Sequence, residues 1–248
     1  MSNLEEDLKY LQLYSICKVY QDKAKEAEEK NLSYTGYLEL LIQEEVTDRI
    51  QRSIKKRITQ AKFPIIKTID TFNFDWPKSI NRKKILQLFD MKFVEEKKNV
   101  LILAPPGMGK THLAISLGYA ACQRRLSTLF ISAIDIVNNL YASMSDFTFT
   151  KKMRSYLRPK ILIIDELGYL PLDKKGSDLL FQIIDKRYEK GSIILTSNLA
   201  FKDWGKIFGN NTTATAAIDR LVHHCEIITI QGDSYRLKDK KNKKLLQV

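Results

Sequence analysis

Residues 100–111 read Val-Leu-Ile-Leu-Ala-Pro-Pro-Gly-Met-Gly-Lys-Thr, an apolar run followed by a loop with two glycines and a Lys-Thr pair. The apolar run predicts a buried strand, and the rest follows the phosphate-loop pattern G-x-x-x-x-G-K-[ST] except at its first glycine. In such a loop, backbone N–H groups surround phosphate oxygens, the lysine reaches the β- and γ-phosphates, and the hydroxyl reaches Mg²⁺. A helix that begins near Gly109 would point its positive end at the same phosphates. The stretch therefore predicts a site for ATP and Mg²⁺ between a strand and a helix.

The residues predicted to bind the nucleotide are consecutive: Pro106, Gly107, Met108, Gly109, Lys110, Thr111 and His112. Lys110 is also expected to act in catalysis, and Thr111 is expected to be a metal ligand. The loop departs from the pattern at Ala104, which stands where the first glycine is usual. A positive φ costs an alanine roughly 1 kcal/mol, so we expect a negative φ at this position. The alternative interpretation is a chance Gly-Lys-Thr at the start of an ordinary helix.

The chain has 248 residues and a formal net charge of +12. This length suits one sizeable domain plus a small one, and the charge favours a polyanionic partner, with a solvated basic surface as the alternative. No apolar run approaches the ~20 residues of a membrane span, and the acidic N-terminus lacks a signal-peptide pattern. Cys17, Cys122 and Cys225 are far apart, which predicts reduced thiols. We therefore expect a cytoplasmic protein with no membrane partner.

Beyond residue 100, short apolar runs alternate with helix-like stretches. Five strands are expected, at residues 100–103, 128–132, 161–164, 192–196 and 226–230. Such alternation predicts a parallel sheet with helices on both faces, and we assign residues 66–248 to this α/β domain. Aromatic residues at 72–76 lead into it, and they are interpreted as core, with packing on adenine as the alternative. Asn81 is expected to begin a helix that continues to Val94.

Residues 1–65 predict a small all-helical domain. A first helix is expected to run from Leu4 toward Val19, and apolar residues at every fourth position predict a long amphipathic helix that ends before Pro64. The long helix carries a cluster of basic residues that we predict to contact DNA phosphates: Arg49, Arg52, Lys55, Lys56 and Arg57. The alternative is an ordinary solvated helix face.

Polar side chains follow the third and fourth strands. Asp165 and Glu166 come at the end of a buried strand, where open α/β sheets bind ligands. Asp165 is the second predicted metal ligand, since Mg²⁺ prefers oxygen ligands, and Glu166 is placed to orient or deprotonate the attacking water. Asn198 follows the fourth strand and is predicted to contact the γ-phosphate or that water. The alternative interpretation is a pair of ordinary turns.

Two arginines near the C-terminus fit the same chemistry. Nucleotide hydrolysis builds negative charge on the transferred phosphoryl group, and Arg220 or Arg236 is suited to stabilise it. From chemistry alone, either is equally suited to a surface ion pair. His223 and His224 lack a nearby third ligand in the sequence, so we interpret them as structural or solvent-facing.

Together these blocks resemble the AAA+ ATPases and, within them, the IstB-like helper proteins of insertion sequences. The most specific stretches are Ile-Ile-Asp-Glu-Leu-Gly-Tyr-Leu-Pro-Leu at 163–172, Trp-Gly-Lys-Ile-Phe-Gly at 204–209 and Asp-Arg-Leu-Val-His-His at 219–224. The resemblance covers nearly the whole chain. It implies Walker A at the phosphate loop, Walker B at Asp165 and Glu166, and sensor I at Asn198. It further implies that Arg220 is an arginine finger acting on a neighbouring subunit's ATP, and that Arg236 is sensor II.

The resemblance also implies the fold and the activity. The fold is an AAA+ P-loop NTPase with a parallel five-stranded sheet flanked by helices, preceded by the helical domain. The implied activity is ATP hydrolysis by a homo-oligomer with ATP sites between subunits, which assembles on double-stranded DNA and stimulates a partner transposase. The family is similar to replicative helicase loaders of the DnaC type, which supply the main alternative. A nucleotide-gated binding module without useful turnover is a second alternative.

Overall fold

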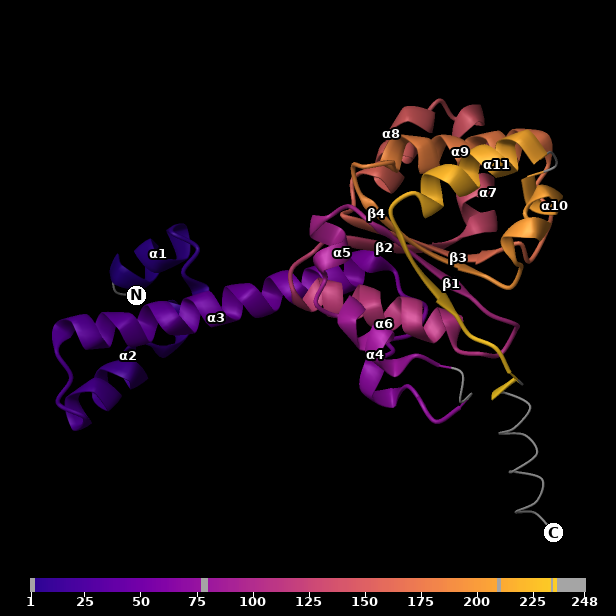
Figure 1. The fold of residues 1–248 in the computed structure, drawn as a ribbon. Helices are drawn as coiled ribbons and strands as arrows, with labels where there is room; N and C mark the ends of the chain where they lie inside the picture. Colours follow the sequence, from indigo (N-terminus) through magenta and orange to yellow (C-terminus); the bar gives the residue numbers. More distant parts are fainter. Residues whose placement is uncertain (1–2, 77–79, 209–210, 233, 236–248) are drawn as a thin grey trace, which may run out of the picture. The chain divides into compact units, whose positions relative to one another are not determined.

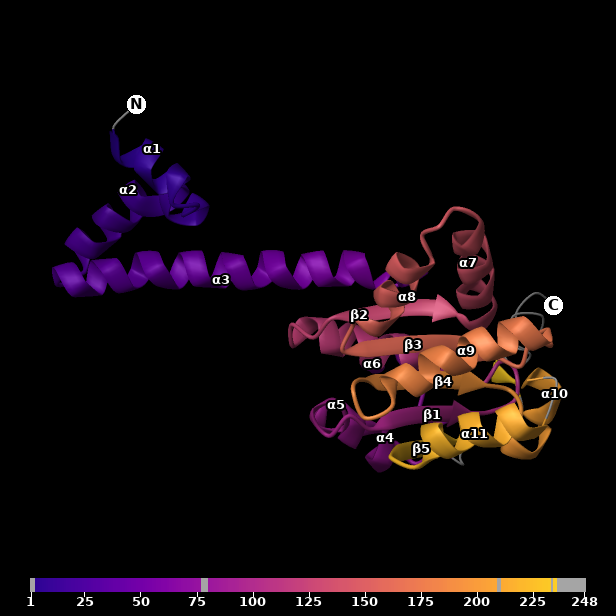
Figure 2. The same ribbon diagram turned by 90° about the horizontal axis from the view of Figure 1, so that it is seen from above.

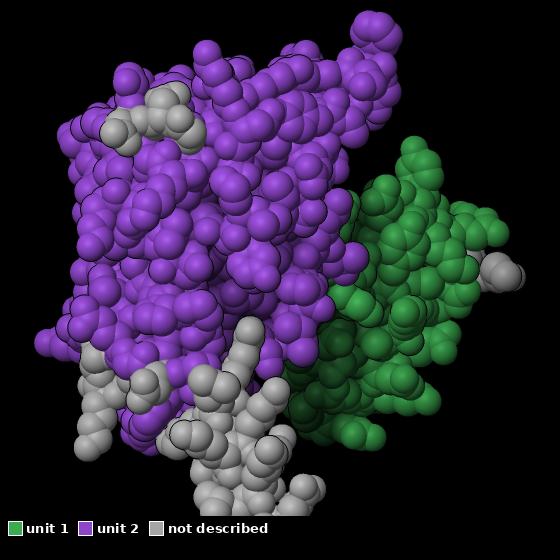
Figure 3. All heavy atoms as spheres, turned by 90° about the vertical axis from the view of Figure 1, so that its right-hand side faces the viewer, with its two compact units in different colours: residues 1–56 green, residues 57–248 purple. Residues whose placement is uncertain are grey.

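The computed structural model describes residues 3–76, 80–208, 211–232 and 234–235. They form two compact units, residues 1–56 and residues 57–248 (Figure 3). The division falls inside helix α3 (Tyr34–Ala61), whereas the composition of the sequence changes near residue 65. Among the described residues, no helix is both long and apolar enough to cross a membrane.

The second unit is built on one parallel sheet. Its strands are β1 (Asn99–Leu103), β2 (Thr128–Ser132), β3 (Ile161–Leu167), β4 (Ser192–Ser197) and β5 (Cys225–Thr229), in the spatial order β2-β3-β4-β1-β5. All four neighbouring pairs are parallel. The five predicted strands are confirmed, with the largest shift at the end of β3. Because β1 lies beside β4 and β4 beside β3, the carboxyl ends of these three strands meet at one edge of the sheet.

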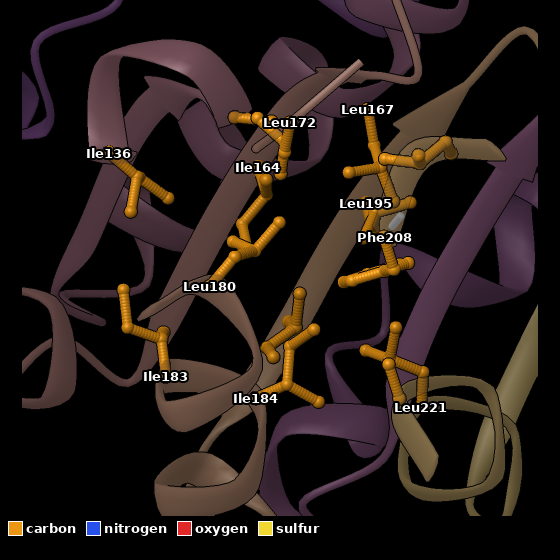
Figure 4. Packing of buried hydrophobic residues seen from close by; sticks show 14 of the residues in the cluster. Ile136, Ile164, Leu167, Leu172, Leu180, Ile183, Ile184, Leu195, Phe208 and Leu221 are labelled. Carbon is orange, nitrogen blue, oxygen red and sulfur yellow. The ribbon is translucent and has the colours of Figure 1, made fainter. Parts of the chain in front are cut away.

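Helices cover both faces of the sheet (Figure 1). On one face pack α4 (Arg82–Leu88), α5 (Lys92–Glu95) and α6 (Lys110–Gln123). On the other pack α7 (Ala133–Ser145), α8 (Phe149–Leu157), α9 (Lys174–Arg187), α10 (Gly205–Phe208) and α11 (Asn211–Val222). Successive strand residues point to opposite faces, so Ile102 belongs to the first hydrophobic cluster and Leu101 to the second. Figure 4 shows part of the second cluster, where α9 residues such as Leu180 pack with Ile164 of β3. Two buried faces explain why the strands are continuously apolar.

Two helices predicted as continuous are interrupted. The first is α1 (Asn3–Tyr10) followed by α2 (Tyr14–Glu29), and the break contains Gln12 at φ 57°. Likewise α4 is separated from α5 by Met91 at φ 61°. A left-handed residue ends a helix without interrupting the apolar periodicity, so periodicity alone does not reveal it. The predicted cap of α4 is confirmed, because the Asn81 side chain accepts a hydrogen bond from the Lys84 N–H at 3.0 Å.

The first unit is held together by a buried carboxylate as well as by apolar contacts. Its hydrophobic cluster contains Leu8, Ile16 and Leu41. Glu45 is buried, and its Oε2 accepts hydrogen bonds from the N–H groups of Ser15 at 2.8 Å and Ile16 at 3.3 Å. Helix α2 has no capping side chain at its own N-terminus, so a residue of α3 satisfies its first N–H groups instead.

The ionised form of Glu45 is stabilised by its partners. Burial alone would raise the pKa of this carboxyl, but the hydrogen bond from Arg49 and those from the two backbone N–H groups outweigh it and hold the pKa below its ordinary value. Arg49 Nε lies 2.7 Å from Glu45 Oε1, and Arg52 reaches the same oxygen at 3.3 Å. The buried charge therefore requires these arginines, because removing one partner of such a pair leaves an uncompensated buried ion.

Candidate functional site

The predicted phosphate loop joins the end of β1 to the start of α6. Gly107 and Gly109 have φ values of 79° and 80°, in the left-handed region that favours glycine. A Cβ at Gly107 would lie 2.1 Å from Ser234 Oγ, and one at Gly109 would lie 2.7 Å from Phe72 Cε2. Only glycine fits at either position. The first N–H groups of α6 have no acceptor within the helix, so the loop offers the donors and the positive helix end that an anion requires.

Ala104 is compatible with this loop. It is not among the described residues with positive φ, which confirms the expected negative value. Its side chain is buried in the cluster around α6, and its N–H donates to the Ser197 carbonyl at 3.2 Å. The alanine therefore carries no left-handed strain, and it links the start of the loop to the end of β4.

Thr111 and Asp165, the two predicted metal ligands, lie in direct contact. Thr111 Oγ1 donates to the Asp165 carboxylate, whose two oxygens lie 3.1 and 3.0 Å away. Asp165 is buried and also accepts a hydrogen bond from Thr196 Oγ1 at 2.5 Å. A hydroxyl and a carboxylate are the oxygen ligands that Mg²⁺ uses beside a phosphate chain, so the donor set fits this ion.

Thr196 was missed at the sequence level. Its Oγ1 donates to Asp165 and accepts from the Glu166 N–H at 3.0 Å, so one hydroxyl positions both acidic residues. The available signal was a threonine directly after the apolar residues of β4, because a buried hydroxyl requires hydrogen-bond partners.

Glu166 has an unusual backbone. Its φ is 59°, and the pairing of β3 with β4 is irregular between Ile164 and Leu167. The side chain of Glu166 is exposed, between the buried Asp165 and Leu167. A left-handed conformation costs a non-glycine residue about 1–2 kcal/mol, and such strain and strand bulges concentrate at functional sites. The local structure thus presents a carboxylate to solvent at the residue that follows Asp165.

The remaining predicted loop residues differ in what they contact. Lys110 Nζ donates to the Pro105 carbonyl at 2.9 Å, so the lysine folds over its own loop. Pro106 is exposed, whereas Met108 is buried in the hydrophobic cluster and has only its backbone to offer a phosphate. Asn198 directly follows β4 and is exposed, at the same sheet edge as the loop.

His112 is turned toward the segment that precedes the sheet. Its Nε2 donates to the Thr68 carbonyl at 3.0 Å and lies 3.2 Å from Thr71 Oγ1. Burial lowers the pKa of this imidazole, and its ring packs edge-on against Phe72, with the ring centroids 5.3 Å apart. Phe72 belongs to the hydrophobic cluster around α6, as expected for a core residue. The geometry gives His112 a structural contact beside the loop.

Arg220 does not lie beside the phosphate loop of its own chain. Its Nε donates to Asp185 Oδ1 at 2.7 Å, and its guanidinium lies 5.0 Å from the centroid of the Phe181 ring. The carbonyl of the next residue, Leu221, accepts from the side chain of Asn99, the first residue of β1. Arg220 is therefore near the amino edge of the sheet, and the length of β1, roughly 15 Å, separates it from the loop.

Arg236 lies outside the described residues, but the two residues before it contact the loop. Tyr235 N–H donates to the Gly107 carbonyl at 3.1 Å, and Ser234 lies against the same glycine. The strand β5 therefore leads the chain back to the phosphate loop.

The basic residues of α3 fall into two groups. Arg49 and Arg52 form ion pairs with Glu45 and Asp48, and Arg49 also donates to the Gln12 carbonyl at 2.8 Å. These contacts tie the turn between α1 and α2 to α3. The other group lies further along the helix and consists of Lys55, Lys56 and Arg57, of which the two lysines are exposed. Contact of the five residues with DNA stays a prediction.

Comparisons with known proteins agree with this geometry. The family described as IstB-like ATP binding protein matches residues 6–243. One relative, from Geobacillus stearothermophilus, is 45% identical over 88% of this chain and 87% of its own length, and its name describes an ATP-binding protein of insertion sequence IS5376. Another, from Pseudomonas aeruginosa, is 38% identical over 97% of this chain and 91% of its own, and is named for ATP binding and insertion sequence IS21.

Solved structures with the same fold are more distant. A DnaC helicase loader matches with a TM-score of 0.55 at 24% identity, over 66% of this chain and 96% of that one. AMPPCP-bound DnaA from Aquifex aeolicus matches with a TM-score of 0.57 at 20% identity, over 71% and 54%. These similarities confirm the AAA+ P-loop fold with its five-stranded parallel sheet. With the family match over most of the chain, they show that this protein belongs to the IstB-like ATP-binding proteins.

Proposed function

We propose that this chain is an ATP-hydrolysing helper of DNA transposition, which acts in the cytoplasm. The single observation that carries the proposal is the cluster at the carboxyl edge of β1 and β3, where Thr111 contacts Asp165 and the next residue of β3, Glu166, has an exposed side chain. A protein that only binds a nucleotide does not need the second carboxylate. The names of the relatives connect the chain to insertion sequences, and hence to a partner transposase.

In the proposed reaction, the loop N–H groups and Lys110 hold the phosphates, and Thr111 and Asp165 hold Mg²⁺. When bound, this ion neutralises phosphate charge. Glu166 accepts a proton from the attacking water as its oxygen bonds to the γ-phosphorus and the bond to the ADP oxygen breaks. Asn198 orients that water or the γ-phosphate, and Arg236 contacts the phosphates from the segment that reaches Gly107.

The proposed active unit is a homo-oligomer. Negative charge develops on the transferred phosphoryl group, and Arg220, an arginine suited to stabilise it, lies at the opposite edge of its own sheet. A neighbouring subunit in a head-to-tail assembly supplies such a group in trans. The apolar side chains of Leu38, Ile42 and Val46, which recur on α3 and are exposed, offer additional surface for association.

Sedimentation of the full chain with a non-hydrolysable ATP analogue, Mg²⁺ and duplex DNA tests this function. We expect large assemblies that require nucleotide and DNA together, and we expect Lys110→Ala to abolish them because the loop loses its phosphate contact. Lys83→Ala, which removes an exposed lysine from α4, is the matched control and should assemble normally. If Lys110→Ala assembles as well as the parent, nucleotide binding at the phosphate loop does not control assembly.

A helicase loader is the second candidate, favoured by the structural similarity to the DnaC loader. It has the same ATPase chemistry but a replicative helicase as its partner. Co-purification with a transposase supports the transposition helper, whereas co-purification with the replicative helicase supports the loader.

Lys55→Glu/Lys56→Glu is expected to weaken duplex DNA binding and to reduce the slope of log K against log salt by about one per lost phosphate contact. These positions are chosen because reversing Arg49 or Arg52 would also disturb the buried Glu45. Lys18→Glu/Lys25→Glu makes the same charge change on exposed positions of α2 and should leave the slope unaltered. If both double variants change the salt slope equally, the basic residues of α3 form an ordinary solvated helix face and do not contact DNA.

A further inference from the structure

Glu189, His223 and His224 form an exposed cluster at the amino edge of the sheet. Glu189 follows α9 and the histidines follow α11, and one candidate ligand atom from each residue lies within 4.8 Å of the others. The sequence showed no third ligand near the histidines, and the fold supplies one from 34 residues earlier in the chain, because α9 and α11 run side by side (Figure 2). Both histidines are exposed, as interpreted from the sequence, but a third candidate ligand lies beside them.

The distances suit a small divalent ion. His224 Nε2 lies 3.4 Å from Glu189 Oε1, and two ligands that hold a tetrahedral ion at about 2.1 Å are themselves about 3.4 Å apart. The two imidazole rings lie next to one another, with centroids 4.1 Å apart. The other candidate ligand atoms of the cluster lie within 4.8 Å of one another.

The surroundings of the cluster resemble those of a metal site. Tyr188 Oη lies 2.7 Å from His223 Nδ1, and bonds of this kind to one ring nitrogen orient metal-binding imidazoles. Glu189 has a φ of 56°, at a position after a helix where glycine is usual. The strained backbone holds a carboxylate beside two histidines, and such outliers concentrate at functional positions.

The neighbouring thiol is an unsuitable ligand. Cys225 follows His224 directly, but it is partly buried against the hydrophobic cluster beneath α9 and does not belong to the group whose candidate ligand atoms lie within 4.8 Å of one another. The ligand set is therefore two imidazoles and one carboxylate, with a fourth position for water. Three such ligands and an open position are characteristic of Zn²⁺ sites and also suit Co²⁺ and Ni²⁺.

We propose that Glu189, His223 and His224 bind one divalent transition-metal ion, with Zn²⁺ as the best fit. The ion would form a second link between the C-terminal ends of α9 and α11, beside the ion pair of Asp185 with Arg220. Asp185 and Glu189 are four residues apart, as are Arg220 and His224, so the two links are stacked along the same pair of helices. The metal site does not depend on the proposed ATPase activity, but through this link the ion fixes the helix that carries Arg220.

Zn²⁺ titration of the untagged full chain, monitored by calorimetry without nucleotide, tests the proposal. We expect one ion per chain, and at least a tenfold loss of affinity in Glu189→Gln and in His224→Ala. Cys225→Ser and Glu95→Gln are the controls and should bind like the parent. Because Glu189→Gln preserves the size of an exposed side chain, its effect should not arise from misfolding.

Co²⁺ provides a second readout, since ligands of this type give visible d–d absorption bands, whereas a thiolate would add an intense near-ultraviolet charge-transfer band. The expected spectrum has the d–d bands without the charge-transfer band, and it is lost in His224→Ala. The proposal is overturned if the parent binds no stoichiometric ion, if Glu189→Gln and His224→Ala both retain full affinity, or if Cys225→Ser alone abolishes binding.

Discussion

Glu166→Gln is expected to lower kcat for ATP hydrolysis by about 10²–10⁴-fold while ATP-dependent assembly on DNA persists. The carboxylate is exposed at the irregularity of β3, directly after Asp165 in the chain, and an amide of nearly the same size cannot accept the proton of the attacking water. Phosphate binding depends on the loop and on Lys110, which the substitution leaves intact. Single-turnover hydrolysis, with nucleotide binding measured on the same protein, separates the two effects.

The matched control for this prediction is Glu95→Gln, the same change at an exposed position of α5. It should retain the turnover of the parent. If Glu166→Gln instead hydrolyses ATP at the parent rate, Glu166 is not the general base. If the parent itself also shows no hydrolysis with Mg²⁺ and DNA, the chain is a nucleotide-gated binding module.

The sequence was sufficient to predict the parts of this protein that depend on local pattern. Apolar runs predicted the strands, and the order of glycines, Lys110 and Thr111 predicted the loop. Thr111 and Asp165 were both predicted to bind Mg²⁺, because Asp165 ends a strand at the position where open α/β sheets bind ligands, and the structure brings them into contact. Each of these inferences requires only periodicity or a motif, together with a general rule of α/β topology.

The features that were missed depend on tertiary contacts between distant residues. Thr196 matters because β4 pairs with β3, and Glu189 matters because α9 packs beside α11. Glu45 was not singled out from the sequence, yet it caps another helix from inside a core. Hydrophobic periodicity also does not reveal the left-handed residues that end α1 and α4, because any residue type can adopt this conformation in a short turn at a modest cost in free energy.

Arg220→Ala is expected to reduce ATP turnover by about 10³–10⁵-fold, the usual contribution of an arginine that neutralises charge in phosphoryl transfer. Since Arg220 lies near the amino edge of its own sheet, the affected ATP is expected to be that of a neighbouring subunit. The variant should still bind ATP, because its own phosphate loop is intact. Steady-state hydrolysis should therefore fall, whereas nucleotide binding measured on the same variant should stay at the level of the parent.

The ion pair of Arg220 with Asp185 and its contact with Phe181 supply the alternative explanation, a purely structural arginine. Asp185→Asn weakens the same pair but keeps the guanidinium, so it should retain turnover if the arginine acts on ATP and should lose it if the pair holds the fold. Mixing Arg220→Ala with Lys110→Ala provides the decisive measurement. In a mixed assembly, a subunit with an intact loop can lie beside one with an intact arginine, so turnover should reappear although neither variant is active alone. Absence of rescue in assemblies shown to contain both variants would mean that Arg220 does not act across the subunit boundary.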